Sequence, residues 1–298
     1  MTRFTRGLAL LILLALAGFG VFWVVTAPDR LPGDTFAGLT GDAARGEQVF
    51  WAGGCASCHS APGAEGEARL VLAGGRAFDT DFGTFHAPNI SPSAAGLAGW
   101  SVADLGNAMM RGVSPEGAHY YPAFPYASYV KATPQDVADL HAFLATLPAS
   151  DTANLPHEVG FPFSVRRLLG GWKFLFFRND WVLAEAEDPT LARGRYLAEA
   201  LGHCAECHTP RNALGGLDRA RWLAGAPSPD GKGTIPNITP AKLDWTDRDI
   251  AAYLKTGFTP DFDSAGGEMA EVVQNMSHLP DEDIAAIVAY LKAVPAVE

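Results

Sequence analysis

The stretches CASCH, residues 55–59, and CAECH, residues 204–208, carry two cysteines and a histidine at the same spacing. Together they contain all four cysteines of the chain. Two disulfides would be an ordinary use of four cysteines in an exported protein, but the repeated arrangement argues against them. A structural zinc ion would need four ligands gathered at one point, and a thioredoxin-like pair needs no following histidine. The two pentapeptides therefore predict two separate sites of one kind.

The N-terminus predicts export. Two arginines precede an uncharged stretch over residues 7–27, and about 20 apolar residues suffice to cross a bilayer as a helix. Basic residues before such a stretch keep that end in the cytoplasm and send the rest of the chain out. A cleaved signal peptide is the alternative, since small residues, ALA at 15–17, precede Gly18. We favour a membrane anchor over residues 1–30, because the apolar run continues through residues 19–25.

In an exported chain, Cys-x-x-Cys-His is the attachment signature of c-type haem. The two thiols add to the vinyl groups, and the adjacent histidine binds the iron. We therefore expect two covalently bound haem c groups. The expected thiols are Cys55 with Cys58 and Cys204 with Cys207, and the expected iron ligands are His59 and His208.

The sequence around each pentapeptide also repeats, so one structural unit is present twice. APNISP, residues 87–92, recurs as IPNITP, residues 235–240. GWSVADLGNAMMRG, residues 99–112, recurs as DWTDRDIAAYLKTG, residues 244–257, each with apolar residues at helical spacing behind a capping Ser or Thr. Each unit is also expected to have an opening helix, over residues 42–50 or 188–201, and a closing helix, over residues 133–147 or 279–294.

Gly46 and Gly194 lie in the middle of the opening helices, where glycine costs about 1 kcal/mol relative to alanine. We predict that each glycine lets the closing helix of its unit approach, with Phe143 and Tyr290 as the aromatic partners. A tolerated surface glycine is the alternative.

The order of opening helix, CxxCH, Pro-Asn-Ile, Trp-bearing helix, ligand loop and closing helix resembles the class I cytochrome c fold, present twice. From about residue 40 to residue 294 the chain is also similar to the membrane-bound multihaem cytochrome c subunits of periplasmic alcohol and gluconate dehydrogenases. CASCH, APNISP, YPAFPYASY, GHCAECHTPRN, IPNITP and GGEMAEVV carry this resemblance. Those subunits commonly have three haem units, and this chain has two. The resemblance implies a mainly α fold, with two tandem class I cytochrome c domains behind an N-terminal transmembrane helix.

We expect the first cytochrome c domain over residues 40–148, an interdomain linker over 149–187 and the second domain over 188–298. The aromatic core of the linker, residues 161–177, contains three cations and is too short and too charged to span a membrane. It is expected either at the membrane surface or against a partner, or packed between the two domains.

The resemblance also implies how the ligating histidines are held. A backbone carbonyl that accepts the second ring N–H fixes the orientation of the imidazole. Pro88 and Pro236 mark the segments expected to offer these carbonyls to His59 and His208. Ordinary turn prolines are the alternative.

The sixth iron ligand is expected in the loop before each closing helix. In the second unit, the resemblance implies that Met269 of GGEMAEVV binds iron, because a thioether stabilises the reduced metal and raises its potential. Met276 is the alternative. Phe124 follows Gly112 by the same number of residues as Met269 follows Gly257. Phe124 therefore holds the corresponding position in the first unit.

Phe124 cannot bind iron, although related subunits have a methionine in this position. His119, on the same stretch, is the nearest nitrogen donor, so we predict that it is the sixth ligand and makes the first site bis-histidine. Met109 or Met110 on the preceding helix, or an open iron, are the alternatives.

The formal net charge is −11, which argues against nucleic acid or anionic headgroups as partners. The resemblance implies a dihaem electron-transfer protein on the inner (cytoplasmic) membrane, with its haem domains facing the periplasm. It would relay electrons from a dehydrogenase to an oxidase, a soluble cytochrome or quinone, while substrate oxidation happens elsewhere. A dihaem enzyme such as a peroxidase, with an open first haem, and a fixed subunit of a terminal oxidase complex are the alternatives.

Overall fold

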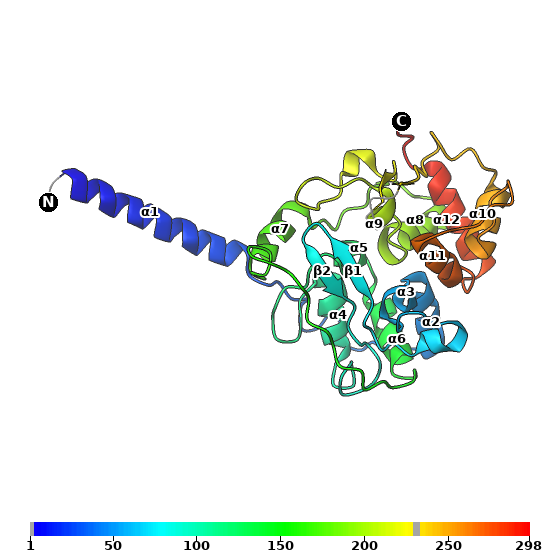
Figure 1. The fold of residues 1–298 in the computed structure, drawn as a ribbon, viewed down its shortest axis with the longest axis horizontal. Helices are drawn as coiled ribbons and strands as arrows, with labels where there is room; N and C mark the ends of the chain where they lie inside the picture. Colours follow the sequence, from blue (N-terminus) through cyan, green and yellow to red (C-terminus); the bar gives the residue numbers. More distant parts are fainter. Residues whose placement is uncertain (1–2, 229–232) are drawn as a thin grey trace.

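The helices of the computed structural model, which describes residues 3–228 and 233–298, follow the repeat in the sequence (Figure 1). The N-terminal helix is α1 (Arg3–Val25). The first unit contains α2 (Ala43–Ala52), α3 (Cys55–His59), η1 (Gly66–Leu70), β1 (Ala77–Thr80), β2 (Gly83–His86), α4 (Val102–Arg111), α5 (Tyr126–Tyr129) and α6 (Pro134–Leu144). The connection contains α7 (Leu168–Phe176). The second unit contains α8 (Pro189–Arg195), η2 (Tyr196–Leu201), α9 (Ala205–His208), η3 (Arg219–Arg221), β3 (Ala226–Pro227), β4 (Thr234–Ile235), α10 (Asp247–Thr256), α11 (Glu268–Met276) and α12 (Asp281–Ala293).

Each unit is held together where its opening helix crosses its closing helix, α2 on α6 and α8 on α12. A methyl group on Gly46 would lie 2.0 Å from a backbone oxygen of the closing helix, and one on Gly194 would lie 1.8 Å away. The atoms struck would be the carbonyl oxygens of Asp139 and Ala286, with the Cβ atoms of Phe143 and Tyr290 also within reach. The prediction that these glycines are helix contact points is therefore confirmed.

An ion pair joins the same two helices in each unit. Arg45 binds the buried carboxylate of Asp139 at 2.8 Å, and Arg193 binds Asp283 at 2.7 Å. Burying a carboxylate is costly unless it is paired and hydrogen-bonded, so these pairs fix how the helices are aligned.

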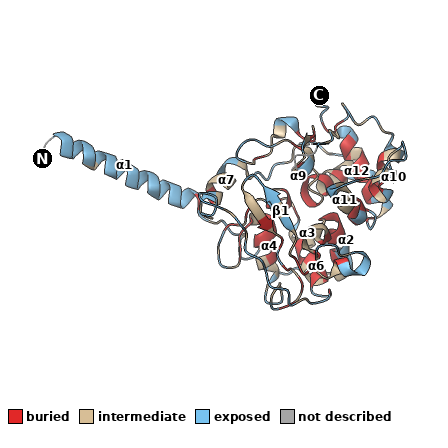
Figure 2. Ribbon diagram, viewed as in Figure 1, coloured by how far each residue is buried: buried red, intermediate tan, exposed pale blue. Residues whose placement is uncertain are grey.

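One hydrophobic core contains residues of both units. Figure 2 shows buried residues on helices of both units, among them α2, α6 and α12. At the edge of this core, Trp51 of the first unit stacks on His278 of the second, with ring centroids 3.7 Å apart and planes 3° from parallel. Tyr129 contacts His203 edge to face, with centroids 5.5 Å apart. The units are therefore packed directly against each other.

Helix α1 projects from this body, and α7 lies at its base (Figure 1). By length and composition, α1 is apolar enough to cross a membrane, with a mean hydropathy of 2.7 over its most apolar window. Arg167, just before α7, donates to the carbonyl of Trp23, and its guanidinium lies 4.2 Å from the indole centroid. A methyl group on Gly170 would lie 2.3 Å from the carbonyl oxygen of Thr26, so α7 packs closely on the end of α1.

One face of α7 also packs between the two units, as one of the two interpretations of the linker predicts. Lys173 donates to the carbonyls of Arg111 and Gly112 in the first unit, at 2.6 and 2.8 Å. Trp172 donates to the carbonyl of Leu214 in the second unit at 3.0 Å. The linker therefore contacts both units as well as α1.

Candidate haem sites

The two pentapeptide histidines are held in the same way. His59 donates from Nδ1 to the carbonyl of Pro88 at 2.8 Å, and His208 donates from Nδ1 to the carbonyl of Pro236 at 2.8 Å. With the proton on Nδ1, Nε2 keeps its lone pair for a metal. Desolvation lowers the pKa of both rings, although the carbonyl hydrogen bonds oppose it, so the neutral imidazole that binds iron is favoured. The predicted role of the two prolines is confirmed.

A glycine closes each of these loops. Gly74 donates its backbone N–H to the carbonyl of His59, and Gly225 donates to that of His208, both at 2.7 Å. Both glycines have positive φ, 71° and 84°, and a methyl group on Gly74 would lie 2.5 Å from the carbonyl carbon of Pro88. Only glycine fits such close backbone approach at this conformation.

The asparagine of each Pro-Asn-Ile segment ties the segment to the chain that follows the closing helix. Asn89 donates to the carbonyl of Ser150, and Asn237 donates to that of Val297, both at 2.7 Å. The segment whose proline carbonyl orients each histidine is therefore also held at its asparagine. The sequence motif marked these segments, but the role of the asparagine came only from the structure.

The thiols fit thioether attachment. Among the described residues, which include all four cysteines, no disulfide joins them. Desolvation raises the pKa of Cys55 to about 12 and that of Cys58 and Cys204 to about 11, so the thiols are uncharged. Two neutral thiols beside an imidazole with a free Nε2 form the donor set that c-type haem requires.

Met269 lies in the first turn of α11, so the expectation of a loop at this position is wrong. The helical spacing of Met269, Val272, Val273 and Met276 explains the difference, because it gives the segment one apolar face. Met269 is half-buried, whereas Met276 is buried in the shared core. The thioether methyl of Met276 lies 3.5 Å from the point where a methyl on Gly202 would stand. Met276 therefore has a packing role.

The surroundings of His119 contradict its predicted role as the sixth ligand of the first iron. The ring is buried, its Nε2–H donates to the carbonyl of Thr26 at 3.0 Å, and its Nδ1 accepts from Lys173 at 3.1 Å. Its own carbonyl accepts from Arg166 at 2.9 Å. Both ring nitrogens are thus bonded to protein groups at the base of α1, which leaves neither for iron.

Two tyrosines contact Phe124 in the first unit. Its ring is half-buried and lies edge to face with Tyr120, and it is tilted against Tyr129, with centroids 6.1 and 5.7 Å apart. Met109 and Met110 are buried in the shared core. Phe124 therefore takes a packing position where the second unit has Met269.

The remaining histidines have structural partners. His86 pairs with Glu158, His141 donates to the carbonyl of Trp100, His157 accepts from the backbone of His86, His203 donates to the carbonyl of Leu201, and His278 stacks on Trp51.

Helix α11 of the second unit is bonded to the first unit, which sequence reasoning missed. Arg76 binds the carboxylate of Glu268 at 2.7 Å and donates to the carbonyl of Ser57, inside CASCH, at 2.5 Å. Arg69 binds Glu271 at 2.9 Å. The partners in these two ion pairs are 192 and 202 positions apart in the sequence, so no local pattern predicts them.

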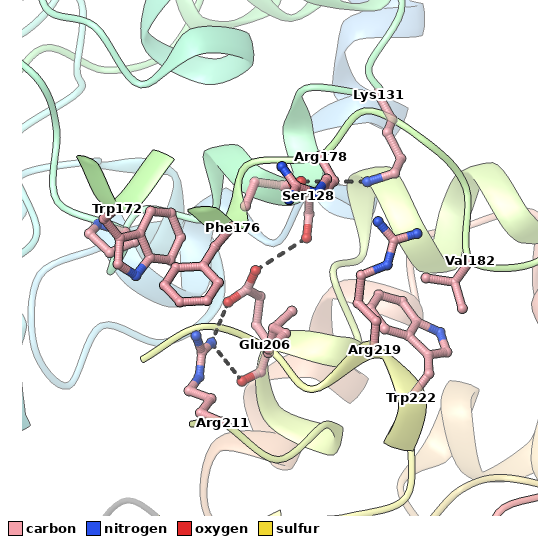
Figure 3. A pocket seen from close by; sticks show the side chains of 13 residues that line it. Ser128, Lys131, Trp172, Phe176, Arg178, Val182, Glu206, Arg211, Arg219 and Trp222 are labelled. Carbon is pink, nitrogen blue, oxygen red and sulfur yellow. Dashed lines mark hydrogen bonds and ion pairs between the residues drawn. The ribbon is translucent and has the colours of Figure 1, made fainter. Parts of the chain in front are cut away.

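A cleft between the units borders the second pentapeptide (Figure 3). Glu206 of CAECH accepts a hydrogen bond from Ser128 of the first unit at 3.3 Å, and it also pairs with Arg211. Other cations and aromatic rings on the walls are Lys131, Arg178, Arg219, Trp172, Phe176 and Trp222. The second attachment segment is therefore linked to the first unit on this side too.

Comparison with known proteins agrees with the geometry. The family model for cytochrome c matches residues 43–148 and 191–295. The chain is 61% identical over 295 residues to a "Diheme cytochrome c-type" protein of Cereibacter sphaeroides, covering 99% of this chain and 98% of that protein.

More distant relatives are named as dehydrogenase subunits. The chain is 38% identical over 261 residues to the fructose dehydrogenase cytochrome subunit of Gluconobacter japonicus, covering 85% of this chain and 52% of the relative. It is 35% identical over 283 residues to the gluconate 2-dehydrogenase cytochrome c subunit of Pantoea cypripedii, covering 88% and 63%. The chain thus spans only part of the length of these subunits. Both domains match the cytochrome c family model, and in each of them a proline carbonyl orients the histidine of the pentapeptide. The chain therefore belongs to the cytochrome c family and carries two covalently bound haem c groups.

Proposed function

We propose that this chain is a membrane-anchored dihaem cytochrome that accepts electrons from a periplasmic dehydrogenase and passes them to the respiratory chain. The observation that carries the proposal is the pair of identically held histidines, His59 and His208, on two units that share one core. Relatives that are named as cytochrome subunits of fructose, gluconate and alcohol dehydrogenases support the same role.

Each unit supplies its own attachment residues. We assign Cys55 and Cys58 with His59, and Cys204 and Cys207 with His208, to the two haem groups. Each bound haem supplies an iron that alternates between the ferric and ferrous states. The chain orients each imidazole through a proline carbonyl and favours its neutral form, because desolvation lowers the pKa of the ring.

In the second unit we assign Met269 as the sixth ligand. Its rival Met276 is committed to the core beside Gly202, whereas Met269 stands half-buried at the start of α11. Methionine favours reduced iron, so the second site is the one of higher potential.

The interface between the units connects the two sites. Helix α11 of the second unit packs on α3, which is the CASCH segment of the first unit. Arg76 of the first unit bonds both Glu268 of α11 and the carbonyl of Ser57 in CASCH. Electrons exchanged between the sites cross this interface.

We also propose that α1 anchors the chain in the inner membrane, with both units on the periplasmic side. The base of α1 is bonded to the linker, and the exposed linker residues near it are almost all apolar: Phe161, Pro162, Phe163, Val165, Leu168, Phe174 and Leu175. The linker cations Arg166, Arg167 and Lys173 instead bond to protein carbonyls. A surface of this kind suits the lipid interface.

We place the first cytochrome c domain over residues 40–148 and the second over residues 188–298. The acceptor is an oxidase, a soluble cytochrome or quinone. Relatives act with fructose, gluconate or alcohol dehydrogenases by name, so the dehydrogenase partner rather than this chain sets the substrate. These relatives favour the relay over a dihaem peroxidase.

The test uses membranes from a strain with and without this chain. Addition of the partner's substrate should reduce haem c in the first membranes, and oxygen should then reoxidise it. Fructose, gluconate and ethanol are the first substrates to try, one at a time. If loss of the chain leaves substrate-dependent oxygen uptake unchanged for every periplasmic dehydrogenase in the strain, the relay is refuted. Catalytic consumption of hydrogen peroxide by the purified reduced protein would instead support the peroxidase.

A further inference from the structure

Helix α11 belongs to the second unit, yet it packs on α2 and α3 of the first unit as well as on α10 of its own. Helix α3 is the CASCH segment itself. The helix that begins with Glu268 and Met269 is thus placed between two units. Its position depends on contacts from both of them.

The first of these contacts involves the residue next to Met269. Arg76 lies in the first unit and donates from one nitrogen to both carboxylate oxygens of Glu268, at 2.8 and 2.7 Å. Its other terminal nitrogen donates to the carbonyl of Ser57 at 2.5 Å. A guanidinium that is fixed to backbone on one side is a rigid partner, and charge-assisted bonds of this kind are among the stronger ones.

The second contact is made by Arg69 with two residues of α11, which lie about one and two turns after Glu268. The guanidinium of Arg69 binds Glu271 at 2.9 Å and the side-chain oxygen of Asn275 at 3.2 Å. Only 6% of the Arg69 side chain is exposed. Asn275 in turn donates to the hydroxyl of Ser57 at 2.6 Å. A buried cation is stable only when it is paired, so Arg69 keeps this side of α11 against the first unit.

We propose that Arg69 and Arg76 of the first unit are positioning residues for the second haem, because they hold the helix that presents its sixth ligand. The inference rests on the proposed function, in which Met269 is that ligand. It makes the ligation of the second iron depend on the interface between the units. Both arginines reach the second unit through side chains of α11, namely Glu268, Glu271 and Asn275.

The experiment follows Arg76→Gln in the full-length haem-loaded protein. The readouts are the far-red charge-transfer band of methionine-ligated ferric haem, the affinity for added imidazole, which displaces a weakly held methionine, and the midpoint potential of each haem. Loss of the ion pair should tighten imidazole binding at the second haem by roughly fivefold, the factor that about 1 kcal/mol represents. Arg69→Gln should have a larger effect, because the Arg69 side chain is itself buried and bonds the buried Asn275 as well as Glu271.

Two controls make the result specific. Glu298→Gln removes a surface ion pair of the second unit, the one with Lys242, and should leave imidazole affinity unchanged. Exchanging the charges in the double variant Arg76→Glu with Glu268→Arg should restore part of the wild-type affinity. If Arg69→Gln fails to fold, Arg76→Gln and the exchanged pair still decide the question.

Met269→Leu separates this inference from the ligand assignment beneath it. If the far-red band disappears in Met269→Leu but imidazole affinity in Arg76→Gln equals that of Glu298→Gln, the ligand assignment stands and the positioning role is refuted. If the band survives in Met269→Leu, the ligand assignment is wrong and the positioning role falls with it. Loss of the band in Met269→Leu together with tighter imidazole binding in Arg76→Gln supports both.

Discussion

Replacing Gly194 by alanine tests how closely the second unit is packed around its histidine site. The added methyl would lie 1.8 Å from the carbonyl oxygen of Ala286, whereas ordinary contact starts at 3.4 Å. Helices α8 and α12 would have to separate by about 1.5 Å to relieve the overlap. The separation also strains a buried hydrogen-bond chain, in which Trp222 donates to Tyr290 and Tyr290 donates to Glu199, both at 2.9 Å.

The expected change in the free energy of unfolding combines two destabilising effects and one stabilising effect. Overpacking costs about 1–3 kcal/mol, and a buried hydrogen bond left unmade adds about 1–3 kcal/mol. Alanine in a helix recovers about 1 kcal/mol relative to glycine. We therefore expect the free energy of unfolding to fall by about 3 kcal/mol and the midpoint temperature to fall by roughly 6–12 °C, because the two units share one core and unfold as a large domain.

The assay is thermal unfolding of the full chain, followed by far-ultraviolet circular dichroism and by the Soret band. Gly171→Ala is the matched control, because it lies in α7 and a methyl there meets nothing within 4 Å. That control should be neutral or slightly stabilising. If Gly194→Ala unfolds at the same temperature as Gly171→Ala, the close helix crossing does not exist in solution and the packing of α8 on α12 is refuted.

Acid-acetone should leave all haem on the chain, and mass spectrometry should show two haem additions; fewer than two with intact cysteines would contradict the attachment sites. His119→Ala should leave the spectrum and potential of the first haem unchanged while lowering stability by about 1–3 kcal/mol, since it leaves buried polar partners unsatisfied; a new high-spin signal would restore the histidine as a ligand. Phe124→Met should raise the potential of the first haem if its side chain faces the iron, and an unchanged potential would place it elsewhere. In nanodiscs, a spin label attached through Leu175→Cys should be accessible to oxygen but not to a water-soluble nickel chelate. The control is a label attached through Glu282→Cys, at the exposed start of α12, which should be accessible to the chelate. Equal accessibility of both labels would exclude lipid contact of the linker.

The sequence alone determined the features that depend on neighbouring residues. CASCH and CAECH each place the two cysteines expected to attach haem and the histidine expected to bind iron within five adjacent positions, so this signature can be read without the fold. The Pro-Asn-Ile segments and the glycines at 46 and 194 were also recognisable, because each repeats at the same place in both units. Repetition supplies a second, independent observation of the same local requirement.

Tertiary structure decided which distant groups meet. His119 stands on the ligand stretch in sequence, but its ring satisfies both nitrogens with Thr26 and Lys173 at the base of α1. Arg76 finds Glu268 across 192 positions. Such choices depend on the packing of whole units, because a side chain can rotate towards any neighbour that the fold brings near and a buried polar group takes the partner that satisfies it. Spacing along the chain therefore marked the histidine expected at each haem, and packing between distant helices decided which groups His119 and Glu268 meet.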